Sequence, residues 1–512
     1  MFFKRSLSRG LSSEMGFFLD GLQEKLNLCL ASKTLYNHLL PYLYWSLEIY
    51  GTKNCFDCIT FLDAHPHLAR HVRTLMLHPN YLRMSNKKRL LDEARLAEEL
   101  ERIIPNLCSL EKIVWDGLEL PPDRIWAAFR NSCPLLKYVG ANLGAKDLCA
   151  DSELFSFQNL TGFSLTTELR DSNYRPSIIS SGESLPEGLW TMLLDRCPEL
   201  ETLVIGHRGA MHFSRRHIDV SPIIQAKWPQ LRELTMENCR IFDSFESLGN
   251  SRALFSSFVK SHRKLTRLHL MGLPCLDLDI YNPPFALQSY GSGLENNPYI
   301  AVATGSLREL NFTQQQYSGM FFRHICFILG SNLNVRKLTL AMDFSRDNTL
   351  EEESDILPQY NHIQELKSVV ASCNRLEDLT VICSTKRKET FFYKDFPEVL
   401  RGSSLKRVEL WKYHRVGDET PSNLALRIAR ENPSMERIVI RTLHQLWDKE
   451  YDPLRILQVG YYKVIRDAQG KPRHLTVNET GGETMAWMLT KRCTLPISTP
   501  RKWCSFLKWK GS

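Results

Sequence analysis

The stretch Leu265-Thr266-Arg267-Leu268-His269-Leu270 decides the fold, because its pattern recurs along the chain. Aliphatic residues occupy the first, fourth and sixth places, and polar residues stand between them. Side chains alternate between the two faces of an extended strand, so Leu268 and Leu270 share one face and His269 points to the other. Six residues cannot bury such a face alone. The strand must therefore stack against other copies of this repeat motif.

Twelve copies of the repeat motif, this one included, occur along the chain. Their first residues are Val72, Leu110, Leu135, Leu160, Leu200, Leu231, Leu265, Leu307, Val335, Leu376, Leu405 and Met435. The weakest copy is Leu135-Leu-Lys-Tyr-Val-Gly140. The intervals run from 25 residues (110 to 135) to 42 residues (265 to 307), enough for a strand and a return helix.

This spacing predicts the α/β class and an irregular leucine-rich-repeat solenoid, with parallel strands on the concave face and helices on the convex face. Strands are expected to begin near residues 74, 112, 162, 202, 233, 267, 309, 337, 378, 407 and 437. The long segment 273–300 is expected to be an insertion between repeats.

A second signature precedes several copies. Its occurrences are Cys133-Pro134-x-Leu, Cys197-Pro198-x-Leu and Cys373-x-x-Leu, and Asn432-Pro433 occupies a similar place. Proline stops a helix and biases the residue before it toward extended geometry. We therefore expect each return helix to end there, with the thiols acting as small buried hydrophobes.

Composition fits a soluble intracellular protein. The 512 residues are 43% hydrophobic and 24% charged, and the formal net charge is +8. That charge does not by itself indicate nucleic acid, and no apolar run reaches membrane-spanning length. The 14 cysteines lack paired spacing and no secretory signal opens the chain, which favours the cytoplasm or the nucleus. We expect no nucleic acid and no membrane as partners.

The first 16 residues are expected to form a disordered terminus. They carry Lys4, Arg5 and Arg9, with no acid before Glu14. A mitochondrial transit peptide has the same character, so a mitochondrial location stays open as the alternative.

Residues 17–50 predict two short helices broken near Ser32, a suitable N-cap. The sequences Leu28-Cys-Leu-Ala-Ser-Lys-Thr-Leu35, Leu39-Leu-Pro-Tyr-Leu-Tyr44 and Ser46-Leu47-Glu48 resemble the latter half of an F-box, in the form found in fungal F-box/leucine-rich repeat proteins. The family's opening Leu-Pro and its first amphipathic helix have no counterpart before this half.

The resemblance implies a partner and a function. A Skp-type linker of a cullin ligase would dock on Leu28, Leu30, Ser32, Lys33, Leu35, Leu39, Pro41, Leu43 and Tyr44. The chain would then be the substrate-recognition subunit of a Skp/cullin/F-box E3 ubiquitin ligase, acting in protein degradation, and monomeric outside that complex. Its substrate would be a protein that the sequence does not identify. The alternative is a plain repeat scaffold, in which 17–50 is a helical F-box-like cap over the first repeat without linkage to a ligase.

No motif for catalysis or cofactor binding stands where this fold could use it. Cys55-x-x-Cys58 has no second pair at zinc spacing, so two packed helix thiols are favoured over a metal site. We expect a binding module that is not an enzyme, with no catalytic residue, no metal and no cofactor.

The predicted division of the chain is a terminus at 1–16, the partial F-box-like helices at 17–50, the solenoid at 51–450, and a C-terminal part at 451–512. In the last part, 461–466 and 473–477 predict a β-hairpin that caps the final repeat. A basic and aromatic tail, 501–510, follows it.

The partner is expected on outward-facing positions of the concave strands. The candidates are His269, Met271, Asn311, Thr339, Thr380, Ile382, Glu409, Trp411 and Arg441. Early counterparts such as Val139 and Val204 are mostly apolar. Trp411 is the preferred anchor, because large aromatic residues dominate interface energetics. The alternative is that Trp411 packs beneath a loop at 384–396.

Overall fold

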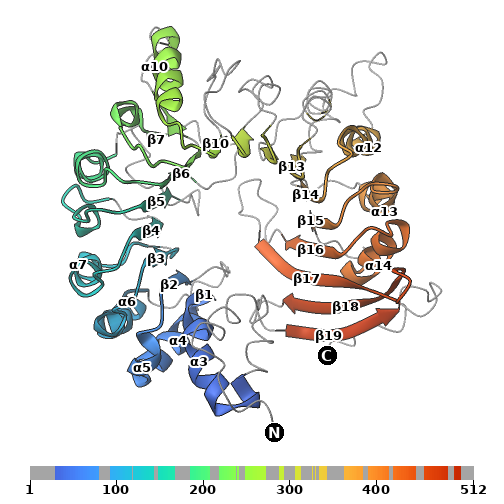
Figure 1. Ribbon diagram of the computed structural model, residues 1–512, viewed down its shortest axis with the longest axis horizontal. Helices are drawn as coiled ribbons and strands as arrows, with labels where there is room; N and C mark the ends of the chain where they lie inside the picture. The colour runs from blue at the N-terminus through green and yellow to red at the C-terminus, as the bar shows by residue number, and fades with distance from the viewer. Residues whose placement is uncertain are drawn as a thin grey trace. The chain divides into compact units, whose positions relative to one another are not determined.

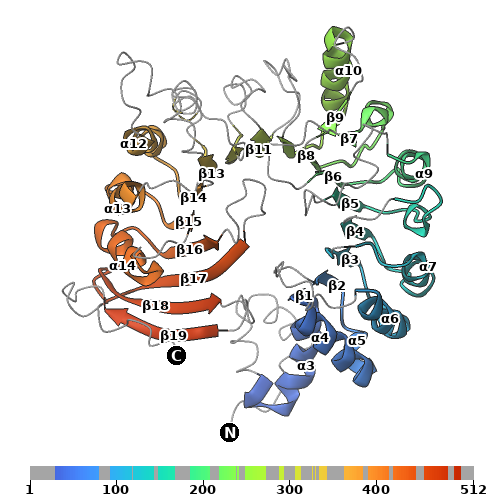
Figure 2. The same ribbon diagram turned by 180° about the vertical axis from the view of Figure 1, so that it is seen from behind.

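The computed structural model is shown from two sides in Figures 1 and 2. It describes residues 29–79, 93–117, 119–142, 148–167, 185–207, 218–237, 239–241, 248–271, 287–292, 306–312, 326, 329, 334–342, 362–383, 390–413, 419–444, 455–481 and 489–496. The terminus 1–16 and the tail 501–510 lie outside these residues. The described chain forms two compact units, which divide between Val204 and Ile205. The boundaries predicted at residues 50 and 450 stay predictions.

The first unit is a parallel sheet with helices along one side. Its strands are β1 (Ser46–Tyr50), β2 (Thr74–His78), β3 (Lys112–Trp115), β4 (Tyr138–Asn142) and β5 (Gly162–Thr167), and each pairs in parallel with the next. Strand β6 (Thr202–His207) spans the division. The helices are α3 (Lys33–Tyr44), α4 (Thr52–Ala64), α5 (Pro66–Ala69), α6 (Glu93–Ile103), α7 (Asp123–Ser132) and α9 (Glu187–Thr191), with short turns η2 (Ile104–Asn106), η3 (Glu153–Phe155) and η4 (Met192–Arg196).

The second unit repeats this architecture. Its parallel strands are β8 (Glu233–Glu237), β10 (Arg267–Met271), β11 (Ser289–Ser292), β12 (Glu309–Phe312), β13 (Lys337–Met342), β14 (Asp378–Cys383), β15 (Arg407–Tyr413) and β16 (Arg437–His444). Helices α10 (Leu248–Ser261), α12 (His362–Ser372), α13 (Thr390–Val399) and α14 (Pro421–Glu431) lie along one side, as does the turn η5 (Ser221–Gln225). Strands β7 (Ile218–Asp219) and β9 (Cys239–Arg240) form a separate pair.

An antiparallel extension ends the second unit. Strand β17 (Arg455–Arg466) pairs with β16, then with β18 (Pro472–Gly481), and β18 pairs with β19 (Leu489–Pro496). Gly470 closes the β17–β18 turn with a φ of 77°, a left-handed conformation that favours glycine. The predicted hairpin is therefore confirmed, and β19 adds a third strand that sequence reasoning missed.

The repeat motif builds the core of both units. Leu265, Leu268 and Leu270 are fully buried, and the matching residues of the other well-formed copies are also buried. Every predicted strand start is confirmed. The protein is thus an α/β leucine-rich-repeat solenoid of mostly parallel strands. Within the described residues, no helix combines the length and the apolar character needed to span a membrane.

The copy assigned to Leu135 is wrong by one residue. Leu135 is 47% exposed, whereas Val139 and Ala141 are buried in the core. Val139 pairs with Ile113 of the preceding strand, so the copy begins at Leu136. A shift of one residue exchanges the two faces of a strand. Val139 is therefore a core residue, not an outward one.

Within the parallel repeat sheet, strands β1 and β11 lie where the sequence reasoning placed none. Strand β1 ends the segment 17–50 and joins the repeat sheet through parallel pairing with β2. Strand β11 lies within the expected insertion 273–300. It belongs to a degenerate copy of the repeat motif, Leu287-Gln-Ser-Tyr-Gly-Ser292, in which Leu287 and Tyr290 are buried. This copy divides the longest interval, between Leu265 and Leu307.

The helix-ending signature is confirmed. Cys133 is the C-cap of helix α7 and Asn432 that of helix α14, where the side-chain amide of Asn432 donates to the Ile428 carbonyl at 3.1 Å. Burial raises the pKa of the Cys133 thiol to about 12. The thiol is thus protonated at neutral pH and packs as a small apolar group.

Candidate functional site

Strand alternation determines which side chains face away from the helices. In β15, Val408 and Leu410 are buried, so Arg407, Glu409 and Trp411 occupy the other face. In β16, Ile438 and Ile440 are buried in the same way. We call this helix-free side of the second unit's sheet the open face.

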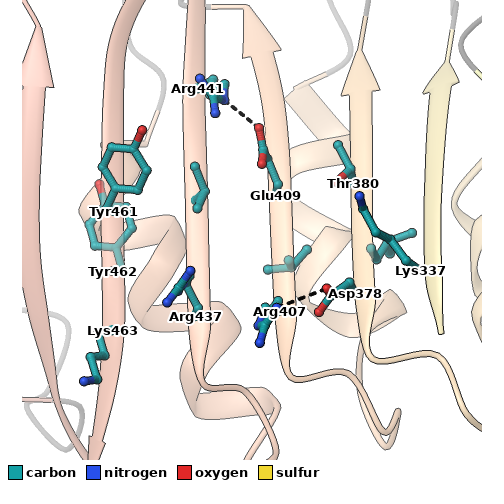
Figure 3. A pocket seen from close by; sticks show the side chains of 13 residues that line it. Lys337, Asp378, Thr380, Arg407, Glu409, Arg437, Arg441, Tyr461, Tyr462 and Lys463 are labelled. Carbon is teal, nitrogen blue, oxygen red and sulfur yellow. Dashed lines mark hydrogen bonds and ion pairs between the residues drawn. The ribbon is translucent and has the colours of Figure 1, made fainter. Parts of the chain in front are cut away.

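A groove of about 520 Å³ lies on the open face across β13 to β17 (Figure 3). We call it the β13–β17 groove. Its charged lining consists of five basic side chains and two acidic ones: Lys337, Arg407, Arg437, Arg441, Lys463, Asp378 and Glu409. The remaining lining residues are Leu379, Thr380, Val408, Val439, Tyr461 and Tyr462. The excess of basic groups makes the groove cationic.

Both acids of the groove are paired with arginine. Arg407 lies 3.4 Å from a carboxylate oxygen of Asp378, and Arg441 lies 2.5 Å from one of Glu409. Burial raises the pKa of Asp378, although the charge of Arg407 acts to lower it. Each acid neutralises one neighbouring guanidinium, so these pairs add little to the net charge of the groove.

Lys337 is paired at the edge of the groove. Its ammonium forms an ion pair with Glu309 on the neighbouring strand β12. Burial acts to raise the pKa of Glu309, but the hydrogen bond and charge of Lys337 hold it below its usual range. A charged Glu309 therefore compensates Lys337.

Arg437 and Lys463 differ from these three cations. They face each other in the antiparallel register of β16 and β17, and both are exposed. Within the described residues, neither side chain makes an ion pair or a hydrogen bond. They supply the positive charge of the groove that no ion pair between described residues engages.

Trp411 forms a cluster with two groove residues. Its indole Nε1–H donates to Glu409 Oε1 at 2.6 Å, and Arg441 Nε donates to the same oxygen at 2.5 Å. The ring is half-buried on the open face. Residues 390–396, expected in a loop, belong to helix α13. Whether Trp411 anchors a partner stays a prediction.

The structure brings only some predicted partner residues together. Thr380, Glu409 and Arg441 line the groove, and Thr339, Ile382 and Trp411 lie on the same strands outside it. His269 and Asn311 lie on the more distant β10 and β12. Met271 belongs to β10, and its side chain is outside the described residues.

His269 belongs to a packed cluster of its own. Its Nε2 lies 3.0 Å from the hydroxyl of Ser289, and burial lowers the pKa of the imidazole. Gly291 stands beside it in the register of β10 and β11. A Cβ atom at Gly291 would lie 3.0 Å from the ring, so the missing side chain leaves room for it.

Sequence reasoning missed most of the groove's charge. Lys337, Asp378, Arg407 and Arg437 occupy the third place of the repeat motif, whereas only later places were considered. The signal was available, because the third and fifth places share a strand face. The repeat motif could not predict Lys463, because this residue lies on the antiparallel strand β17.

The residues proposed for linker docking lie in and before α3. Ser32 caps this helix by accepting a hydrogen bond from the Thr34 amide at 3.2 Å, which confirms its predicted role. Leu30 is 85% exposed and Leu39 is buried. Lys33 is exposed, while Leu35, Pro41, Leu43 and Tyr44 are half-buried, and Leu28 lies outside the described residues.

The Cys55-x-x-Cys58 pair lies in helix α4. Cys55 is buried and its thiol donates to the Ile49 carbonyl at 3.5 Å. Burial raises the pKa of Cys55 to about 12 and that of Cys58 to about 11. Among the described residues, no His, Cys, Asp and Glu side chains group in a way that could hold a metal ion.

No family model matches this sequence, and no curated protein matches it either. Among solved structures, the chain is similar to one from the crystal structure of the Rad7 and Elc1 complex in yeast. The identity is 13% and the TM-score 0.35, over 81% of this chain and 94% of the other. At this level of similarity, no property of that complex is transferred to the present protein.

Proposed function

We propose that the protein is a binding module whose open face holds a segment of another protein. The observation that carries this proposal is the β13–β17 groove, an open cationic surface that five strands build together. Neighbouring strands lie about 4.8 Å apart and each offers alternate side chains to the same face. Such a surface suits an extended chain better than a small enclosed substrate.

A binding role is favoured over a catalytic one by the groove's lining. Its two carboxylates are engaged with arginine, so neither is free to act as a general base. Within the described residues, no serine, cysteine or histidine lines the groove. On this lining we propose a binding role for the groove, without enzymatic activity or a cofactor.

Photo-crosslinking tests the binding role. A photoreactive phenylalanine analogue placed at Thr339 on the open face should crosslink to a partner protein in cells. The same group at Lys367, exposed on the outer side of α12, serves as the control. Equal crosslinking at both positions, or none at Thr339, would overturn the assignment of the open face.

We further propose that this module is the substrate-recognition subunit of a Skp/cullin/F-box ubiquitin ligase. The F-box resemblance of residues 28–48 supports the proposal. Leu30, within that segment, is 85% exposed, and Tyr36 in α3 is 42% exposed. Exposed large apolar side chains of this kind suit a docking surface for the Skp-type linker. A ligase subunit of this type would act in the cytoplasm or the nucleus.

The alternative is a repeat scaffold without a ligase, and one observation favours it. Strand β1 pairs with β2 along its full length, and the ring of Tyr44 stacks on Phe61 of α4 at 6.3 Å. The segment therefore covers the first repeat, as the end of a solenoid requires, whether or not it binds a linker.

Co-purification separates the two proposals. We expect the full chain to co-elute with a Skp-type linker, and Leu30→Glu to abolish co-elution. The matched control is Leu254→Glu, because Leu254 is also an exposed helix leucine, at 50%, and lies in α10 of the second unit. Failure of the unaltered chain to co-elute would leave the scaffold role.

A further inference from the structure

The charges at the strand starts form an almost complete series of pairs. Arg267 lies 3.0 Å from Glu233, Lys337 pairs with Glu309, and Arg407 pairs with Asp378. The series then ends with Arg437 on β16 and Lys463 on β17 (Figure 3). Among the described residues, neither of these two cations forms an ion pair with an acid.

The surroundings of the two cations are suited to a ligand. Val439 and Tyr461, each two residues away on the same strands, face each other in the register and continue the groove wall. Tyr461 is 37% exposed, so its ring and hydroxyl are accessible from the groove. A guanidinium and an ammonium, neither in an ion pair, thus lie side by side at one end of the groove, and the Tyr461 ring lines the wall next to them.

We propose that this end of the groove binds an acidic segment of the partner protein, with an aspartate or glutamate carboxylate held between Arg437 and Lys463. The inference rests on the proposed binding function and specifies its ligand. A guanidinium matches a carboxylate in planar geometry, and charge-assisted hydrogen bonds are the strongest available here.

The remaining charges limit what else can bind. The carboxylate of Asp378 lies close enough to Arg437 for the two charges to interact, so it would repel the second charge of a phosphate dianion bound there. Arg441, four residues along β16, is already neutralised by Glu409. The geometry therefore suits one acidic anchor followed by uncharged residues, in preference to a long acidic run.

Selection from an unbiased library of random displayed peptides tests the inference with the full-length protein. Peptides enriched on the unaltered protein should share an aspartate or glutamate. The best binder is then synthesised, and its affinity is measured by fluorescence anisotropy. Two analogues replace its acid with the matching amide or with phosphoserine. We expect the amide to bind about tenfold more weakly and the phosphoserine no more tightly than the acid.

Variants locate the contact. Arg437→Gln and Lys463→Gln should each weaken the acidic peptide about tenfold, and Arg437→Lys should retain part of the affinity. The control is Arg267→Gln, which removes an exposed arginine from the same place of the repeat motif on β10 and should leave binding unchanged. Unaltered melting temperatures would show that the variants fold.

Several results would overturn the inference. In the selection, they are enrichment of peptides without an acid or no enrichment at all. In the binding measurements, they are tighter binding of the phosphoserine analogue, or displacement of the labelled peptide by single-stranded RNA at a lower concentration than by unlabelled peptide. Among the variants, it is a loss of affinity in Arg267→Gln equal to that in Arg437→Gln. Crosslinking at Thr339 distinguishes a failure of the proposed acidic ligand from a failure of the proposed binding function. If a partner crosslinks there while acidic peptides fail, the binding function stands and only the acidic ligand is wrong.

Discussion

Arg441 stands directly across from Trp411 in the parallel register of β15 and β16, with its guanidinium carbon 5.1 Å from the centre of a Trp411 ring. Glu409 accepts hydrogen bonds from both side chains. A cation over an aromatic face is attracted to it, and a shared carboxylate fixes the arrangement. Trp411 is therefore part of the wall beside the groove and also a support for its charges.

This arrangement predicts that replacing Trp411 affects both stability and partner capture. Trp411→Ala should lower the free energy of unfolding by about 1–2 kcal/mol, because it removes a cation–π contact and a hydrogen bond. It should also weaken partner capture at a temperature where the variant is fully folded. Thermal melts and crosslinking from Thr339 measure the two effects. Trp411→Phe keeps a ring for Arg441 and should restore most of the stability. Full capture by Trp411→Ala would show that the ring is structural only.

Two leucines test the corrected register. Leu268→Ala should cost about 2–5 kcal/mol, because it leaves a cavity in a fully buried position. Leu135→Ala should cost less than about 0.5 kcal/mol, since Leu135 is exposed. Urea denaturation of both variants provides the measurement. A large loss for Leu135→Ala would support the original assignment of that copy.

More of the fold than of the candidate site could be predicted from the sequence. Strand starts were predictable because each buries aliphatic residues at fixed places, and only local periodicity is needed for that. At Leu135 two adjacent leucines made the register ambiguous. The Cys133-Pro134 pair resolves it, because in Cys197-Pro198-Glu-Leu200 the leucine follows the proline by two residues, which selects Leu136. Strand β11 was hidden because Tyr290 and Ser292 replace the usual aliphatic residues.

The groove was less predictable, for a physical reason. Its charge depends on which cations lack a partner, and that follows from pairing between strands. Arg437 is one of several arginines at the third place, and nothing local distinguishes it from Arg407. The antiparallel register puts Lys463 beside it where an acid could stand, so that Arg437 has no ion pair among the described residues.

Gly291 and His269 should be energetically coupled. Gly291→Val should destabilise the protein by about 1–3 kcal/mol, because the new side chain meets the imidazole at a distance of close contact. In the background of His269→Ala the same change should cost much less, since the ring is gone. A double-mutant cycle from denaturation data gives the coupling. Additive costs would contradict the close approach of the two residues.

His262 gives the protein a predictable dependence on pH. Its Nε2 accepts a hydrogen bond from the Trp228 amide at 3.2 Å, so Nδ1 carries the proton and donates to the Phe258 carbonyl at 2.7 Å. Burial lowers the pKa of this imidazole below its usual value of 6.5, although the hydrogen bond to Phe258 acts to raise it. In the unfolded chain the imidazole takes up a proton at higher pH than in the folded protein. His262 therefore contributes its full stabilisation to the folded protein above a pH of about 6.5. This stabilisation is lost as the pH falls from there toward the pKa of the folded state.

The test is the slope of stability against pH. The melting temperature of the unaltered protein should fall as the pH is lowered from about 7 to 5, and His262→Gln should have a shallower slope. Glutamine can keep an acceptor for the Trp228 amide without titrating, so the variant should still fold. His67→Gln is the control, because His67 lies exposed in α5 and should leave the slope unchanged. If His262→Gln and the unaltered protein lose stability in parallel, the imidazole is not held neutral by the fold, and the assigned tautomer is wrong.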